Sequence, residues 1–168
     1  MHDEATEKTS RKAKIWVCRS GVNGIFEEFF LSNSVAGFAI GKTINYKPDD
    51  DYKALYRNLL PYFDEEKKPS LTISRIFTIA NKVSVGDIVL MPRHNAKKQY
   101  SVGIITGSCV YEPSGVLSFY RKVSWRNTID KASLDKPTCN SLGSLLTLFE
   151  VHCSNSSYDL IVKSVGNI

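Results

Sequence analysis

Three segments between Ser101 and Val151 decide the fold: SVGIITGSCVYEP (101–113), FYRKVSWRNTIDKASL (119–134) and CNSLGSLLTLFEV (139–151). In order they are typical of a strand, a turn, a second strand, a polar loop and an apolar helix. Aromatic residues stand beside cations in this stretch, whereas no obvious catalytic triad or metal-ligand cluster occurs in it. The pattern therefore indicates a binding surface rather than a catalytic one.

The residues on either side of this stretch predict alternating strands and helices. We expect strands at 15–18 and 35–41 and helices at 25–30, 50–62 and 70–81, with Asp49 to Asp51 and Ser70 as caps for the last two. Strands at 87–92, 99–107 and 119–125 follow, then a helix over 140–147 and a strand over 148–153. This order predicts an α+β fold, a small mixed β-barrel flanked by helices.

Length and composition favour one soluble domain. The 168 residues can bury a proper core, and 42% apolar with 23% charged residues is an ordinary globular composition. No apolar run approaches the roughly 18 to 20 residues that span a bilayer, and the N-terminus lacks the apolar segment of a signal peptide. We predict a cytoplasmic protein without a membrane partner: a disordered tail at 1–13, one domain at 14–153, and a C-terminal tail or linker at 154–168.

Neither metal chemistry nor catalysis finds support in the sequence. The four cysteines form no CxxC pair and lack zinc-site spacing to the histidines, so we expect reduced thiols in the core and no metal or cofactor. The segment FDEEKK (63–68) contains Glu66-x-Lys68, but these residues precede Pro69 in a loop rather than standing on a rigid strand. No Ser or Cys nucleophile has a recognisable set of partners. The chain is predicted not to be an enzyme.

Two loops are candidates for contacts with phosphate. The net charge of +5 is compatible with phosphate binding without requiring it. RSGVNG (19–24) joins a strand to a helix, so its backbone N–H groups suit a phosphate or a base edge, or the loop is a plain glycine turn. RHNAKK (93–98) is either a phosphate-binding hairpin tip or a solvated one. The candidate phosphate contacts are Arg93, His94, Lys97, Lys98 and, on a nearby strand, Arg121.

A further candidate contact closes the second predicted strand. In AIGKT (39–43), Gly41 allows a flat ring to approach the backbone, and Lys42 either meets a phosphate or base acceptor or is solvated. Among the aromatic residues, Tyr111 is expected to stack on a base, whereas Trp16 and Trp125 are expected to be structural. These residues therefore predict possible contacts with a base or a phosphate at Gly41, Lys42 and Tyr111.

Seven segments, taken in order, resemble a known family: KIWVCRSG, VAGFAIGKT, DYKALYRNL, KVSVGDIVLMP, YSVGIITGSCVYEP, FYRKVSW and NSLGSLLTLFEV. They are similar to the N-terminal recognition domain of Mrr-type restriction endonucleases, which resembles the PUA-like superfamily of EVE and YTH domains. The resemblance covers about residues 14–152. It implies a domain of a restriction or phage-defence system that binds double-stranded DNA and flips one methylated or hydroxymethylated base into a pocket. A fused or separate endonuclease subunit would then cut.

The resemblance also implies where that pocket lies, between the end of the first strand and the close of the second. The implied base-pocket residues are Arg19, Ser20, Gly21, Asn23, Phe38, Ile40, Gly41, Lys42 and Tyr111. Relatives commonly have tryptophan where this chain has Lys42, so Phe38, Tyr46 or Tyr111 would supply the missing wall. Two alternatives stay open: an RNA-binding PUA- or YTH-like module that uses the same pocket, and an interaction domain whose pocket has decayed.

Overall fold

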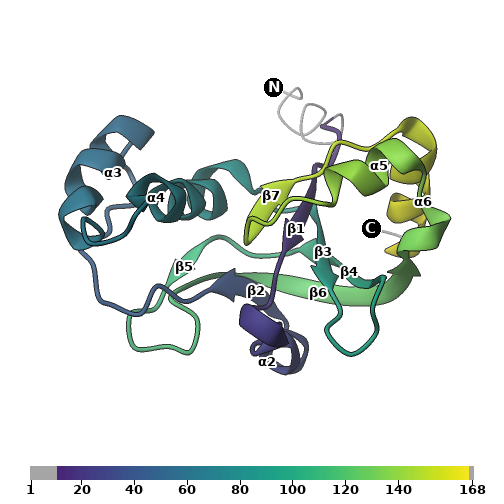
Figure 1. Ribbon diagram of the computed structural model, residues 1–168, viewed down its shortest axis with the longest axis horizontal. Helices are drawn as coiled ribbons and strands as arrows, with labels where there is room; N and C mark the ends of the chain where they lie inside the picture. Colours follow the sequence, from purple (N-terminus) through teal and green to yellow (C-terminus); the bar gives the residue numbers. More distant parts are fainter. Residues whose placement is uncertain (1–10, 167–168) are drawn as a thin grey trace, which may run out of the picture.

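The computed structural model describes residues 11–166. One mixed sheet of seven strands forms its centre, in the order β2-β6-β4-β3-β1-β7, with β5 paired to β6 (Figure 1). Among the described strands β1 and β3 pair in parallel and the remaining pairs are antiparallel. The strands are β1 (Ile15–Cys18), β2 (Val35–Phe38), β3 (Ile88–Pro92), β4 (Gln99–Ile105), β5 (Val110–Tyr111), β6 (Phe119–Asp130) and β7 (Leu148–Glu150).

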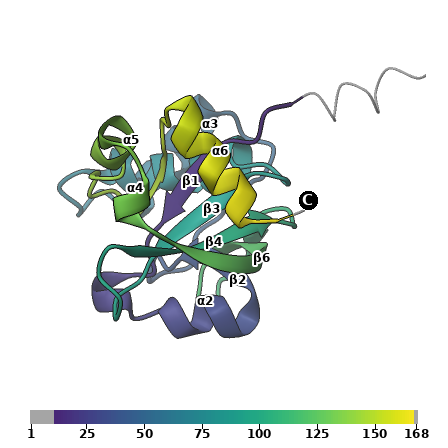
Figure 2. The same cartoon turned by 90° about the vertical axis from the view of Figure 1, so that its right-hand side faces the viewer.

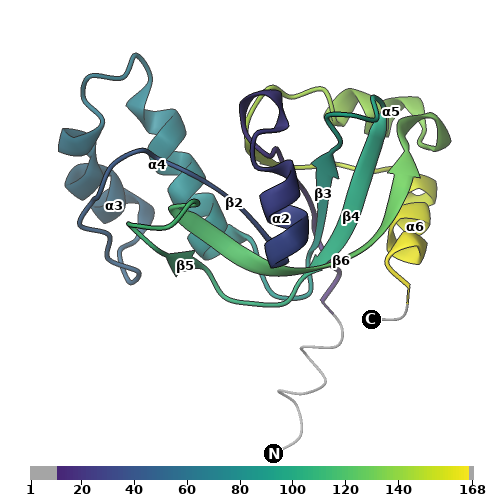
Figure 3. The same ribbon diagram turned by 90° about the horizontal axis from the view of Figure 1, so that it is seen from below.

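The sheet is curled into a half-barrel. β2 and β7 are the two ends of the strand order and do not pair with each other in the described part of the chain. The long strand β6 pairs with β2 and β5 through its first half and with β4 through its second, and it runs along the whole curved sheet (Figure 3). The predicted α+β class, with a mixed sheet flanked by helices, is confirmed, whereas the barrel is open rather than closed.

Helices cover both faces and both ends of this sheet. In Figure 1, α3 and α4 lie at one end, α5 and α6 at the other, and α2 below the strands. One core cluster packs the sheet against the first three helices and a second packs it against α5 and α6. The helices are α2 (Glu27–Asn33), α3 (Tyr52–Leu59), α4 (Pro69–Phe77), α5 (Lys136–Ser141) and α6 (Asn155–Ser164). None of the described helices is long and apolar enough to cross a bilayer.

Two of the predicted helix boundaries are wrong. Helix α4 begins at Pro69, with Lys68 rather than Ser70 in the capping position, because the fixed φ of proline suits the first helical residue. The helix expected at 140–147 is instead α5 (Lys136–Ser141), which is capped by Asp135, whose side chain accepts from the Thr138 amide at 3.1 Å. The cap predicted for α3 is confirmed, since Asp51 accepts from the Ala54 amide at 2.8 Å.

The C-terminal segment is a packed helix rather than a tail or linker, so that prediction is wrong for 154–166. Ser154 caps α6 by accepting from the Ser157 amide at 3.2 Å, and Ile161 and Val165 are 0% and 1% exposed. Figure 2 shows α6 lying across the strands, in front of β3 and β4. Ser and Asn at its start read as linker residues, yet they are the residues that helix N-termini prefer. Residues 167–168 lie outside the described residues.

The residues before β1 also pack against the domain. Arg11 forms an ion pair of 3.1 Å with Asp87, which is fully buried, and Ala13 accepts a hydrogen bond from the Tyr158 hydroxyl at 2.8 Å. Asp87 also accepts from the Trp16 indole at 3.0 Å, so the structural role predicted for Trp16 is confirmed. The predicted tail at 1–13 is therefore wrong for 11–13, and its residues 1–10 lie outside the described part of the chain.

Candidate functional site

Two adjoining cavities lie on either side of the loop that follows β1. The first, which we call the cationic cavity, measures about 340 Å³ and lies between this loop and the 93–98 hairpin loop. The second, the apolar cavity, measures about 520 Å³ and lies between this loop, the end of β2 and helix α4. Arg19, Gly21 and Asn23 line both. The sequence predicted the two loops as separate candidates, and the fold brings them to one place.

Glycine makes this meeting possible. Gly24 has φ of +69°, and a Cβ there would stand 2.6 Å from the Cβ of His94, so no other residue lets the two loops touch. Gly21 has φ of +84°, and a Cβ there would stand 2.7 Å from the Ile25 side chain. The amides of Gly24, Ile25 and Phe26 donate to carbonyls of residues 20–22 within the loop. Those three N–H groups are therefore not open to a phosphate.

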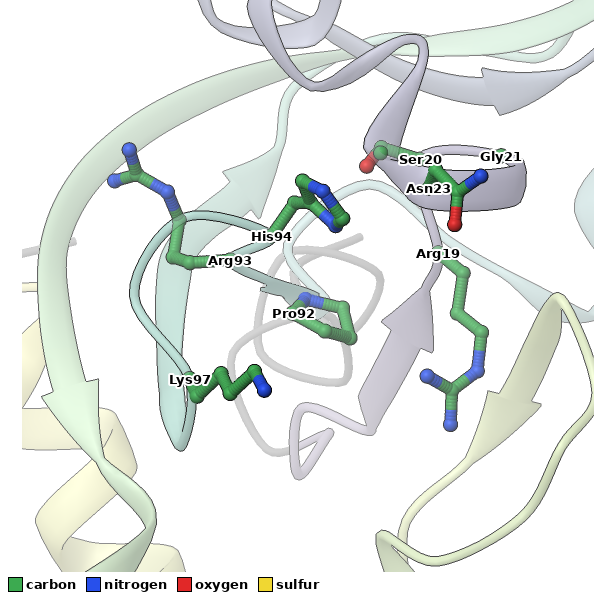
Figure 4. Close-up of a pocket in the computed structure, with 9 residues that line it drawn as sticks. Arg19, Ser20, Gly21, Asn23, Pro92, Arg93, His94 and Lys97 are labelled. Carbon is green, nitrogen blue, oxygen red and sulfur yellow. The ribbon is translucent and has the colours of Figure 1, made fainter.

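Arg93 lines the cationic cavity, but its charge is paired with a carboxylate of the protein itself. Its Nε pairs with the carboxylate of Glu27, which is 8% exposed, and its Nη1 donates to the Ser101 hydroxyl at 3.3 Å. The second carboxylate oxygen of Glu27 accepts from the His94 amide at 3.3 Å. In Figure 4 the Arg93 guanidinium turns away from the other labelled side chains. Arg93 thus fixes the hairpin loop, and the prediction that it is a phosphate contact is wrong.

Arg19 and Lys97 supply the accessible positive charge of the cationic cavity. Figure 4 shows them on opposite sides of Pro92, with His94 and Ser20 above. The Arg19 guanidinium donates to two neutral carbonyls, Leu146 O at 3.2 Å and Ser144 O at 2.5 Å, which position it without cancelling its charge. Lys97 is exposed and forms no ion pair with any described residue. The geometry suits an oxyanion held between two cations.

The apolar cavity opens where β2 ends. This strand stops at Phe38, three residues earlier than predicted, and Ala39 beyond it is exposed at the cavity. The Phe38 ring is 4% exposed, and the half-buried Phe26 ring also lines the cavity. These aromatic and small residues form walls that fit a flat, uncharged ring.

Arg75, Phe26 and Thr147 line the apolar cavity and were not predicted as site residues from the sequence. Arg75 comes from α4, a helix far from RSGVNG in sequence, and its guanidinium lies 5.3 Å from the centre of the Phe38 ring. The available signal was a lone arginine within the apolar stretch LTISRIF (71–77). A charged side chain on an otherwise apolar helix requires an ion-pair or hydrogen-bond partner, or access to solvent or a ligand.

Tyr111 packs into the core, and the prediction that it is a pocket wall is wrong. Its ring stacks on Phe119 with centroids 4.7 Å apart. Its hydroxyl accepts from the Ile44 amide at 2.9 Å and donates to the Ile44 carbonyl at 3.1 Å. The Tyr46 ring packs edge-on against the Tyr111 ring, with the two centroids 5.7 Å apart. Tyr111 therefore anchors the 39–51 connection, and neither it nor Tyr46 lines either cavity.

The residues at 40–42 also lie outside the two cavities, because the chain turns away from them after Ala39. The Ile40 amide donates to the Ser118 hydroxyl at 2.9 Å, and Gly41, with φ of +74°, faces open space. Lys42 donates to the Tyr62 carbonyl at 2.7 Å and pairs with the Glu65 carboxylate. The base-pocket role predicted for Ile40, Gly41 and Lys42 is therefore wrong. Lys42 ties this connection to the end of α3 instead.

Arg121 is structural, so its predicted phosphate contact is wrong. The residue is 6% exposed, and its guanidinium donates to three carbonyls: Ile79 O at 2.7 Å, Gly107 O at 3.0 Å and Ala80 O at 3.2 Å. These bonds satisfy the short π-helix at 78–82 that follows α4. Lys98 is exposed on the hairpin loop but lines neither cavity.

The cationic cavity therefore brings together six of the predicted site residues besides Arg93. The six are Arg19, Ser20, Gly21, Asn23, His94 and Lys97 in the cationic cavity; Phe38 lines the adjoining apolar cavity.

No curated protein and no solved structure matches the chain. A family model described as a domain of unknown function, DUF8426, matches residues 14–152. The chain belongs to the DUF8426 family.

Proposed function

We propose that this domain recognises nucleic acid by taking one base into the apolar cavity while the adjoining phosphate binds in the cationic cavity. One observation carries the proposal: the two cavities share the wall formed by Arg19, Gly21 and Asn23. A nucleotide joins a flat, largely apolar ring to an anion through one sugar, and this pair of cavities has the same order of chemistry.

Double-stranded DNA with a modified base is the ligand that we propose. Flipping a base out of a duplex costs a few kcal/mol, which stacking against aromatic and apolar walls offsets. The resemblance to the PUA-like recognition domains of Mrr-type endonucleases supports this reading, and the curled mixed sheet is compatible with it. In that role the domain is not itself an enzyme: it works in the cytoplasm, and a fused or separate endonuclease subunit cuts.

The cavities suit recognition better than cutting. The groups that line the cationic cavity include the Arg19 and Lys97 cations, the Ser20 hydroxyl, the Asn23 amide and the His94 imidazole, and the Glu27 carboxylate is already paired to Arg93. Cationic, hydroxyl and amide groups of this kind position a phosphate through charge and hydrogen bonds. A methyl or hydroxymethyl group on the base would add apolar or polar contact inside a cavity of about 520 Å³.

A binding panel tests the proposal. Short duplexes that carry 5-methylcytosine, 5-hydroxymethylcytosine, N6-methyladenine or no mark are compared by fluorescence anisotropy, with single-stranded RNA of the same sequence. We expect salt-dependent binding to the duplexes that is tighter for one modified base. Ala39→Trp, which places an indole at the apolar cavity, should remove that preference but leave the salt-dependent part, because the cationic cavity is intact.

Ala132→Trp is the matched control, since Ala132 is exposed in the short 3-10 helix Lys131–Ser133 and lines neither cavity. It should bind like the wild type. Tighter binding of single-stranded RNA than of any duplex would replace the proposal with an RNA-binding one. No salt-sensitive binding to either polymer would refute both.

A further inference from the structure

Arg75 is the one charged side chain of the apolar cavity that comes from outside the loop after β1. It lies on α4, half-buried, with its guanidinium carbon 5.3 Å from the centre of the Phe38 ring. This distance is within the range of a cation–π contact. The contact with Phe38 helps to position Arg75 and uses none of its N–H groups in a hydrogen bond to a protein acceptor.

Those donors have no partner within residues 11–166. The Arg75 side chain makes neither a hydrogen bond nor an ion pair with any residue that the structure describes. Glu66 is the nearby carboxylate, but its Oε2 accepts from the Thr72 hydroxyl at 2.8 Å. The Cys18 thiol stays neutral, because burial raises its pKa to about 12. Other arginines of the chain, such as Arg19 and Arg121, have protein acceptors at their guanidinium groups.

The Arg75 donors are open to a ligand. Partial burial lowers the pKa of Arg75, which means that the surroundings disfavour its charge. Among the described residues no buried side-chain nitrogen lacks a hydrogen-bond partner, so the Arg75 nitrogens reach solvent, and water or a ligand satisfies them at the cavity. A ligand that offers two neighbouring acceptor atoms matches the two parallel N–H groups of the guanidinium fork.

We propose that Arg75 selects the base in the apolar cavity by donating two hydrogen bonds to adjacent acceptor atoms on its edge. This inference rests on the proposed function. Cytosine offers O2 and N3, and guanine offers O6 and N7, as such a pair, and a 5-methyl group on cytosine leaves both acceptors in place. Adenine and thymine lack it, because each of their ring acceptors is flanked by a donor or a C–H group. The cavity therefore takes cytosine-type or guanine-type bases and rejects N6-methyladenine.

Duplexes with the tested base opposite an abasic site probe this selection directly. Without a pairing partner, a base loses only its stacking when it flips, so affinity differences between the two pyrimidines cytosine and thymine, or between the two purines guanine and adenine, report the cavity. Wild-type protein is titrated by anisotropy with cytosine, 5-methylcytosine, guanine, adenine or thymine at that position. We expect the bases with paired acceptors to bind roughly 10-fold tighter or more than adenine and thymine.

Arg75→Lys keeps the charge and loses the fork, and it should reduce that discrimination to about 2-fold or less. Arg57→Lys is the matched control, because Arg57 is exposed on the neighbouring helix α3 and lines neither cavity. It should discriminate like the wild type. Thermal melting of both variants shows that they fold.

The outcomes separate this inference from the proposed function. Discrimination that Arg75→Lys leaves unchanged would overturn the role of Arg75 while base binding in the cavity stands. Equal weakening of all five duplexes by Arg75→Lys, without discrimination in the wild type, would assign Arg75 to phosphate and overturn the inference. If the wild type binds none of the duplexes, the proposed function fails and the inference fails with it.

Discussion

Lys97→Gln isolates the phosphate contact that the cationic cavity provides. Among the described cations of that cavity, Arg93 is paired with Glu27, so Arg19 and Lys97 are the charges left for phosphate. Two contacts between a cation and phosphate give a slope of about −1.8 in a plot of log affinity against log salt concentration, at about −0.9 for each contact. Removing Lys97 should bring the slope to about −0.9, because one phosphate contact is lost.

The size of this effect is easily measured. Between about 50 mM and about 200 mM salt, the wild type should lose about 12-fold in affinity and Lys97→Gln about 3.5-fold. The variant should also bind all duplexes more weakly by a similar factor, since phosphate contacts carry no sequence information. Anisotropy titrations at four salt concentrations with two duplexes of different sequence give both quantities.

Lys98→Gln supplies the control, since Lys98 is the next residue, is equally exposed and does not line the cavity. The two variants change net charge by the same amount, so a general electrostatic effect would alter both slopes alike. We expect Lys98→Gln to keep most of the wild-type slope. Equal slopes for the two variants would refute the contact at Lys97, and a loss confined to modified duplexes would show that Lys97 contacts the base instead.

Three further predictions concern the residues whose roles the structure revises. Tyr111→Phe, which loses the hydrogen bonds with Ile44, should lower the free energy of unfolding by about 1 kcal/mol in urea titrations and leave duplex affinity unchanged. Ile161→Ala should cost about 2 to 5 kcal/mol, because α6 is part of the core; no measurable change would restore the tail interpretation. Hydrogen bonds from Ser154 and Thr138 lower the pKa of Asp135 from 3.8 to about 2. Its stabilising contribution is therefore complete above pH 3.8 and lost as pH falls through about 2, so Asp135→Asn should flatten the fall in unfolding free energy over that interval.

Local patterns predicted the sheet and most of its strands. The apolar runs at 15–18, 88–92 and 99–105 form the strands expected of them, since a buried strand leaves a short continuous apolar signal. The segment after Cys153 was wrongly predicted as a tail, because Ser and Asn are typical both of linkers and of helix N-termini. The burial of Ile161 against the sheet, which no local pattern shows, decides between the two.

The site was predicted in part for a similar reason. Backbone features such as the glycines of RSGVNG are visible in sequence, and that loop lies at the site. Partners of long side chains are not visible: Arg93 meets Glu27 and Arg121 meets Ile79 only once the sheet is assembled. Both arginines resembled phosphate contacts because a sequence shows the charge and hides the acceptor. Arg75 is the converse case, a charge that the fold leaves without an acceptor among the described residues.

Mapping the backbone amides of the ¹⁵N-labelled protein by NMR during titration with a duplex that carries 5-methylcytosine tests the central claim most directly. The account predicts simultaneous shifts at Gly24 and Lys97 in the cationic cavity and at Gly37, Ala39 and Thr147 in the apolar one. Shifts at the cationic cavity alone would mean that phosphate binds and no base enters. Shifts that miss both cavities would contradict the account as a whole.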